Sequence, residues 1–155
     1  MDIYYKPISE SGKQMINYVC KYAPVELFKG FGQECAVLEE MPENFDKSDK
    51  IAHANLCGFG KSVIQAVLEG KVEELVLVNC CDSMRRVYDI IENTKKCKFL
   101  YMLDLPHEDN ECENIKFAQS ILRLKNAYER YSHRTFDREL FIKSFAKPES
   151  ERKPY

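Results

Sequence analysis

The residues best suited to chemistry in this sequence are its seven cysteines, Cys20, Cys35, Cys57, Cys80, Cys81, Cys97 and Cys112. Their number is odd, two are adjacent and no export signal precedes them, so we expect reduced thiols instead of a disulfide framework. No C-x-x-C pair occurs, which excludes zinc ribbons, thioredoxin-like motifs and ferredoxin-type runs. Cys35 and Cys97 fit the ordinary pattern of buried cysteines without a role. Any metal site must therefore be assembled from distant segments.

Two of the cysteines stand where helices are expected to begin. Cys57 lies just before a helical stretch, and Cys81 lies between an expected strand at 74–79 and a helix that opens at Asp82 or Ser83. The N-terminus of a helix carries partial positive charge and unpaired N–H groups, which favour a thiolate. In an open parallel sheet, ligand sites collect beyond the carboxyl ends of the strands. We therefore interpret both cysteines as candidate metal ligands or nucleophiles.

Three other features carry less weight as sites. Residues 60–62, Gly-Lys-Ser, match the end of a phosphate-binding loop, but Asn55 stands where that loop needs its first glycine, so we do not expect nucleotide binding there. The histidines lie in polar or loop contexts and are not expected to be ligands: His53, His107 and His133. Arg85 and Arg86 could contact an anion, although Arg85 with Asp89 has the spacing of a solvated helical ion pair.

The elements that would position these residues alternate between strands and helices. Short apolar runs predict strands at 35–38, 74–79 and 98–103, and a partly apolar run covers 14–19. Helical periodicity or capping residues predict helices after Pro24, up to Gly70, from Asp82 or Ser83 through Ile91, along 117–131, and after Thr135. This alternation predicts an α/β fold: a small parallel sheet flanked by helices, Rossmann-like or flavodoxin-like, with a C-terminal helical extension.

The organisation along the chain follows from its length and composition. At 155 residues we expect an α/β domain over 1–107, a helical extension over 108–146 and a charged tail over 147–155. The 45% hydrophobic and 31% charged composition is that of a globular protein. A net charge of -2 gives no electrostatic support for nucleic acid or an anionic membrane as a partner. Without a signal peptide or a membrane span, the expected location is cytoplasmic.

Four segments in this order resemble the 2-hydroxyacyl-CoA dehydratase family, the D-component group that includes benzoyl-CoA reductase subunits and double-cubane cluster proteins. They are YAPVELFKGFG at 22–32, NLCGFGKS at 55–62, NCCDSMRRVYD at 79–89 and YMLDLPH at 101–107. In the family they are similar to a Pro-x-Glu-Leu helix, an N-L-C segment, a C-D-x-x-R/K-R/K-x-Y-D/E segment and a strand ending in Leu-Pro. The resemblance covers roughly residues 14–107, and it identifies 1–107 as a cluster-binding domain.

The resemblance implies a radical lyase that works under anaerobic conditions. Cys57 and Cys81 match two of three cysteine ligands of an oxygen-sensitive 4Fe–4S cluster, whose open iron binds the thioester carbonyl of a 2-hydroxyacyl-CoA. In the family, an ATP-dependent activator protein injects one electron, a ketyl radical anion forms, hydroxide leaves, and water is eliminated. The implied partners are a second dehydratase subunit, the activator and the acyl-CoA substrate.

Glu26, in the Pro-x-Glu-Leu match, is the candidate catalytic residue. A carboxylate beside an apolar helix start can have a raised pKa and act as acid or base for the departing hydroxyl. The alternative interpretation is a helix-start charge on a solvated face.

Two departures from the family pattern qualify these expectations. The third cysteine comes from a second α/β domain, and no remaining cysteine here matches it; Cys80 beside Cys81 is also untypical and is a competing ligand. We therefore expect an excised domain or a shortened relative that is inactive alone, with an incomplete cluster that is absent after purification in air. A double-cubane cluster reductase or benzoyl-CoA reductase-like subunit is one alternative. A non-catalytic protein that binds a partner or acyl-CoA without a cluster is another.

Overall fold

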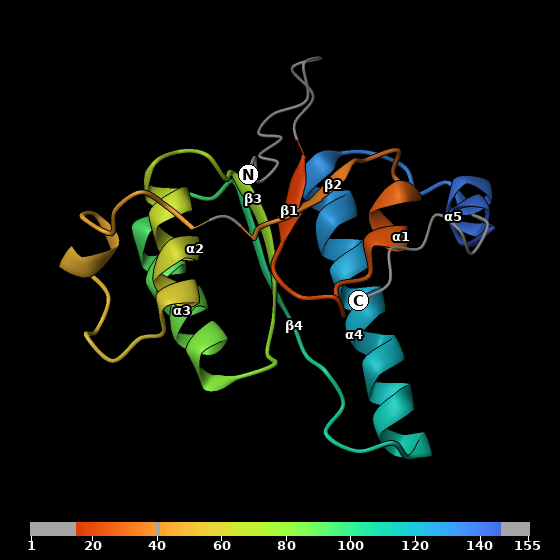
Figure 1. The fold of residues 1–155 in the computed structure, drawn as a ribbon. Helices are drawn as coiled ribbons and strands as arrows, with labels where there is room; N and C mark the ends of the chain where they lie inside the picture. Colours follow the sequence, from red (N-terminus) through yellow and green to blue (C-terminus); the bar gives the residue numbers. More distant parts are fainter. Residues whose placement is uncertain (1–14, 40, 147–155) are drawn as a thin grey trace.

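A four-stranded parallel sheet forms the centre of the protein. The computed structural model describes residues 15–39 and 41–146. The strands are β1 (Ile16–Tyr18), β2 (Cys35–Val37), β3 (Glu74–Val78) and β4 (Phe99–Leu103). Their order across the sheet is β2-β1-β3-β4, and every neighbouring pair is parallel (Figure 1). The predicted α/β class is confirmed.

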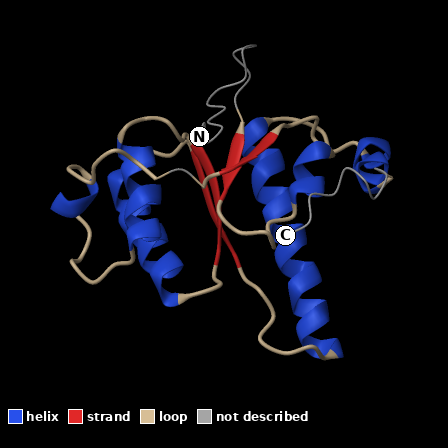
Figure 2. Cartoon of the chain, viewed as in Figure 1, coloured by secondary structure: helices blue, strands red, loops and turns tan. Residues whose placement is uncertain are grey.

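Helices cover both faces of this sheet. They are α1 (Val25–Lys29), η1 (Ser48–Lys50), α2 (Gly58–Leu68), α3 (Asp82–Thr94), α4 (Glu111–Ser132) and α5 (Arg138–Phe145). Figure 2 shows α2 and α3 on one side of the sheet, and α1, α4 and α5 on the other. The helical turn η1 lies in the polar stretch for which the sequence predicts no element.

Strand β3 connects two apolar cores because its successive side chains point to opposite faces. All five of its residues are buried. Val76 and Val78 belong to the cluster that contains α1 and α4, whereas Leu75 and Leu77 belong to the cluster that contains α2 and α3. A strand buried on both faces reads as a continuous apolar run, which is why the sequence alone locates it.

Helix α4 confirms the amphipathic helix expected along 117–131. Leu124 and Tyr128 are buried in the same cluster as Phe28, and the Tyr128 ring packs edge-on against the Phe28 ring at 5.2 Å between centroids.

No helix among residues 15–39 and 41–146 is both long and apolar enough to cross a bilayer. The expected tail at 147–155 lies outside the described residues.

Two predicted helix caps are wrong by one or two residues. Helix α5 is capped by Asp137, whose Oδ1 accepts from the N–H groups of Glu139 and Leu140 at 2.7 and 3.1 Å, and not by Thr135. An Asp side chain can accept both bonds, which explains the choice. Helix α3 begins directly after Cys81, so Asp82 is its first residue and not its cap.

Candidate functional site

The sheet order creates a switch point between β1 and β3. From β1 the chain crosses through α1 to β2 on one side, and the next strand, β3, lies on the other side of β1. Ligands of open α/β sheets bind beyond the carboxyl ends of the strands where the direction of winding reverses. We call this end of the sheet the carboxyl edge. Cys20 lies just after β1, and Cys80 and Cys81 lie just after β3, so all three are at this edge.

Cys57 caps helix α2 with its sulfur. Its Sγ accepts a hydrogen bond from the backbone N–H of Gly60 at 3.3 Å, and the residue is exposed. Helix α2 spans 11 residues and leads into β3, so it runs antiparallel to the strands. Because about 16 Å of helix matches the length of a five-residue strand, the start of α2, directly after Cys57, lies toward the carboxyl edge (Figure 1).

Cys81 stands at the start of helix α3. It is extended, with φ -159° and ψ 165°, it is exposed, and its side chain makes no capping hydrogen bond. In the first turn of α3, the Met84 N–H donates to the Cys81 carbonyl oxygen at 3.2 Å, and the Cys81 sulfur takes no part in capping. Cys57 and Cys81 thus share the predicted feature, a position at a helix N-terminus, and both helices begin at the carboxyl edge.

The starts of α2 and α3 are held together by close packing at Gly60. A Cβ built on Gly60 would lie 3.1 Å from Cγ2 of Val87 in α3 and 3.4 Å from the Cys57 sulfur. Only glycine lets the first turn of α2 approach α3 this closely without displacing a neighbour. The packing links the helix of Cys57 to that of Cys81.

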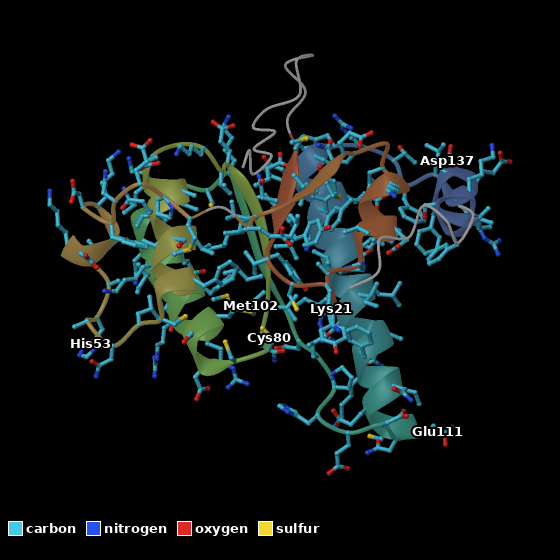
Figure 3. All side chains as sticks on the ribbon, viewed as in Figure 1. Lys21, His53, Cys80, Met102, Glu111 and Asp137 are labelled. Atoms are coloured by element: carbon cyan, nitrogen blue, oxygen red, sulfur yellow. The ribbon has the colours of Figure 1, made fainter. Side chains whose placement is uncertain are left out.

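Cys20 is a neighbour of this site that the sequence interpretation did not select. The Cys80 thiol lies near enough to the thiols of Cys20 and Cys81 for both to influence its pKa. Desolvation, followed by the influence of Cys20 and Cys81, raises the pKa of Cys80 to about 11. Figure 3 places Cys80 and Lys21, the residue after Cys20, at the same end of the sheet. Recognising Ile16–Tyr18 as a strand parallel to β3 would have placed Cys20 here.

Glu26 lies in the first turn of α1, the helix that follows β1, and is half-buried. Its helix begins at the carboxyl edge but covers the opposite face of the sheet from α2 and α3 (Figure 2). Glu26 contributes to the electrostatic environment of the partly buried Cys35 thiol. Its catalytic role remains a prediction.

The weaker candidates have structural partners. Lys61 forms an ion pair with Asp49 at 2.7 Å, and the Ser62 hydroxyl donates to the Gly58 carbonyl at 2.9 Å, so both side chains of the loop-like segment are engaged. The expected ion pair between Arg85 and Asp89 is wrong, because Asp89 pairs with Arg86 at 3.6 Å instead. The i, i+3 spacing brings Arg86 to the same helix face as Asp89.

The donor set at the carboxyl edge fits only part of a cluster site. Within residues 15–39 and 41–146, no group of three or more His, Cys, Asp or Glu side chains is arranged to hold a metal ion. The two exposed cysteines at helix N-termini have the ligand chemistry of an iron–sulfur centre. A cluster held by three cysteines would need a third ligand in addition to Cys57 and Cys81.

A comparison with protein families matches a range of residues that includes all four segments quoted for the family resemblance. The profile of the family described as 2-hydroxyglutaryl-CoA dehydratase, D-component, matches residues 20–154. The match begins at Cys20 and extends beyond the 14–107 resemblance through α4 and α5. No curated protein matches the chain.

Proposed function

Since the chain belongs to the 2-hydroxyglutaryl-CoA dehydratase D-component family and is a 2-hydroxyacyl-CoA dehydratase-like subunit, we propose that Cys57 and Cys81 are two ligands of an iron–sulfur cluster. The observation that carries this proposal is their shared placement: each is an exposed residue directly before a helix that begins at the carboxyl edge. Exposure leaves both sulfurs accessible to a cluster, and the N–H groups at a helix N-terminus can donate hydrogen bonds to a ligating sulfur.

Hydrogen bonding to the sulfur supports the same assignment. The Gly60 N–H that donates to Cys57 Sγ can stay in place when that sulfur binds iron, because a thiolate has several lone pairs. Hydrogen bonds to ligating sulfurs tune the reduction potential of a cluster. Cys80 is a less suitable ligand, because desolvation, with smaller contributions from Cys20 and Cys81, raises its pKa to about 11 and disfavours the thiolate.

The remaining ligand is proposed to come from a partner subunit or from a part of the protein beyond the described residues. A cluster completed in this way would supply one-electron chemistry, fed by an ATP-dependent activator, for loss of water from a 2-hydroxyacyl-CoA. Glu26 is proposed to exchange a proton with the departing hydroxyl. Such chemistry fits a cytoplasmic, anaerobic setting.

Iron binding tests the ligand assignment directly. The chain is reconstituted anaerobically with iron, sulfide and excess dithiothreitol, which can fill open coordination positions, and iron and acid-labile sulfide are quantified after desalting. We expect Cys57→Ser and Cys81→Ser to lose bound iron relative to the wild type. Cys112→Ser is the matched control, because Cys112 is also exposed in the first turn of a helix but lies among acidic residues of α4.

Two results would contradict the proposal. Equal iron retention in all three variants would show that the two cysteines are not ligands. A wild-type chain that retains no iron with the family's partner subunit present would favour a member that binds its partner or acyl-CoA without a cluster.

A further inference from the structure

A cavity of about 490 Å³ opens at the carboxyl edge, next to the ends of β3 and β4. Its walls come from Asn79 after β3, Arg85 of α3, residues 104–107 after β4, and the face of α4 that carries Glu113 and Arg123. The volume lies within the range of small-molecule sites. The cysteine ligand assignment uses none of these residues.

The acidic side chains of this cavity are already paired. Glu113 Oε1 accepts from Lys116 Nζ at 2.7 Å, and Asp104 Oδ1 accepts from Asn79 Nδ2 at 2.8 Å. Lys116 neutralises Glu113, whereas the neutral Asn79 amide holds Asp104 in place and leaves its negative charge at the cavity. Among the described residues, neither Arg85 nor Arg123 has a carboxylate partner, so the Lys and Arg side chains of the cavity outnumber its carboxylates: Arg85, Lys116 and Arg123 against Asp104 and Glu113.

Arg123 is held in place by neutral groups. Its Nη2 donates to the hydroxyl of the buried Ser120 at 2.7 Å, and its guanidinium lies near enough to Tyr101 to influence the pKa of that hydroxyl. A guanidinium has five N–H donors, so the bond to Ser120 leaves others for a ligand. Because neutral partners leave its positive charge uncompensated, Arg123 is preorganised to receive an anion.

Arg85 approaches the cavity from the opposite element, α3. Among the described residues it has neither an ion-pair nor a hydrogen-bond partner, because Asp89 pairs with Arg86. Arg85 lies four residues after Cys81, so the two share a face of α3 about one turn apart. A ligand at Arg85 would therefore lie close to the proposed cluster ligand.

The chemistry of the walls defines the class of ligand. Guanidinium groups match the oxygens of carboxylates and phosphates, to which they can donate two parallel hydrogen bonds. Leu105, Pro106 and Phe117 add apolar surface to the same cavity, which suits a carbon skeleton attached to the anionic group. We propose that this cavity binds a small organic anion, whose carboxylate or phosphate group is held by Arg85 and Arg123.

Calorimetric titration of the metal-free chain at low salt tests the proposal separately from the cluster assignment. The probes are glutarate, which carries carboxylates, coenzyme A, which carries phosphates, and glutaramide as the uncharged counterpart of glutarate. We expect glutarate or coenzyme A to bind, and Arg85→Gln to weaken that binding by about tenfold to a hundredfold, the range for a lost charge-assisted hydrogen bond.

The matched control is Arg86→Gln, since Arg86 is the adjacent residue of α3 and its side chain is 77% exposed. This variant should keep wild-type affinity. Arg123→Gln should weaken binding as Arg85→Gln does, with its folded state checked by circular dichroism.

Binding of glutarate alone identifies a carboxylate ligand, and binding of coenzyme A alone identifies a phosphate ligand. The proposal is overturned if neither anion binds the wild type, if glutaramide binds as well as glutarate, or if the Arg86 variant loses as much affinity as the Arg85 variant.

Discussion

The sulfur of Cys57 and the sulfur of Cys35 have the same chemistry in very different surroundings. Cys57 is exposed and accepts an N–H hydrogen bond at the start of α2. Cys35 lies in β2, where burial raises the pKa of its thiol to about 12, with Lys29 partly opposing the shift. Burial likewise raises the pKa of Cys97 to about 11. Reactivity should therefore differ among the seven cysteines by orders of magnitude.

Thiol labelling of the metal-free chain checks this difference. With iodoacetamide near pH 8, Cys35 should react slowest, because a pKa of about 12 leaves roughly one thiolate in 10⁴. Cys57 and Cys81 should react faster than Cys35 and Cys97, and faster than Cys112. Rates are read by peptide mass spectrometry. Labelling of Cys57 and Cys81 no faster than that of Cys112 would show that the starts of α2 and α3 activate a thiol no more than the acidic start of α4 does.

A second prediction at this scale concerns Glu26. If its carboxyl group exchanges a proton with the departing hydroxyl, Glu26→Gln should lower turnover about a hundredfold in the assembled enzyme, a typical loss for a general acid or base. Iron content should not change, because Glu26 is not a proposed ligand. Turnover is measured with the activator and partner subunit present; an unchanged rate would leave Glu26 as a helix-start charge.

At the scale of elements, the site depends on how closely the first turn of α2 approaches α3. Gly60→Ala would place a Cβ 3.1 Å from Val87 Cγ2 and beside the Cys57 sulfur. We expect this variant to be destabilised by about 1 kcal/mol or more, because overpacking outweighs the helix propensity of alanine. It should also lower iron retention by displacing Cys57. Thermal unfolding and iron quantification measure the two effects.

Gly58→Ala is the control for this prediction. It lies in the same turn, and a Cβ at Gly58 meets no atom within 4 Å. Alanine should therefore be neutral or slightly stabilising there. If both variants have the same melting temperature and iron content, the close approach of α2 to α3 does not matter for the site.

The elements were largely predictable because their signals are local. The run at 74–79 and the heptad-like spacing along 117–131 identify β3 and α4, whose buried faces dictate apolar residues. The position of Cys57 and Cys81 before helices could be predicted for the same reason. Strand β1 has only three residues, and its role depends on pairing with β2 and β3, which are distant in sequence. The contact between Cys20 and Cys80, and the cavity between Arg85 and Arg123, arise from such long-range pairing, so no local pattern indicated them.

For the molecule as a whole, stability should depend on a buried carboxyl group at the opposite end of the sheet from the site. Glu74 begins β3 and is 4% exposed; Tyr131 donates to its Oε1 at 2.9 Å, and Oε2 has no hydrogen-bond partner among the described residues. Burial raises the pKa of Glu74, and the Tyr131 hydrogen bond only partly offsets the shift. The folded state therefore binds this proton more tightly than the unfolded state does.

The sign of the pH dependence follows from that difference. The contribution of Glu74 is most favourable below its unfolded pKa, near 4.5, and is lost as the pH rises through its higher folded pKa. Glu74→Gln should make the free energy of unfolding fall less steeply with pH above 4.5, as measured by urea denaturation. Glu73→Gln, at an exposed neighbour paired with Lys98, serves as the control. Equal slopes for wild type and Glu74→Gln would contradict the assignment.

The carboxyl edge concentrates the features that the family assignment leads one to seek. The profile match from 20 to 154 includes both cysteine-bearing helix starts and the α4 face of the cavity. A site built in this way would place the proposed cluster ligands and the arginine pair on the helices that flank one end of the sheet. The central claim is that Cys57 and Cys81 belong to a single site.

Chemical cross-linking tests that claim most directly. A thiol cross-linker that spans two ligands of one cubane, roughly a few ångströms to 7 Å, is added anaerobically to the metal-free chain in a Cys80→Ser background, which removes the competing neighbour. The account predicts that a peptide joining Cys57 to Cys81 dominates the products seen by mass spectrometry, and that prior loading with iron and sulfide suppresses it. Single modification of each cysteine, without a Cys57–Cys81 link, would contradict a shared site.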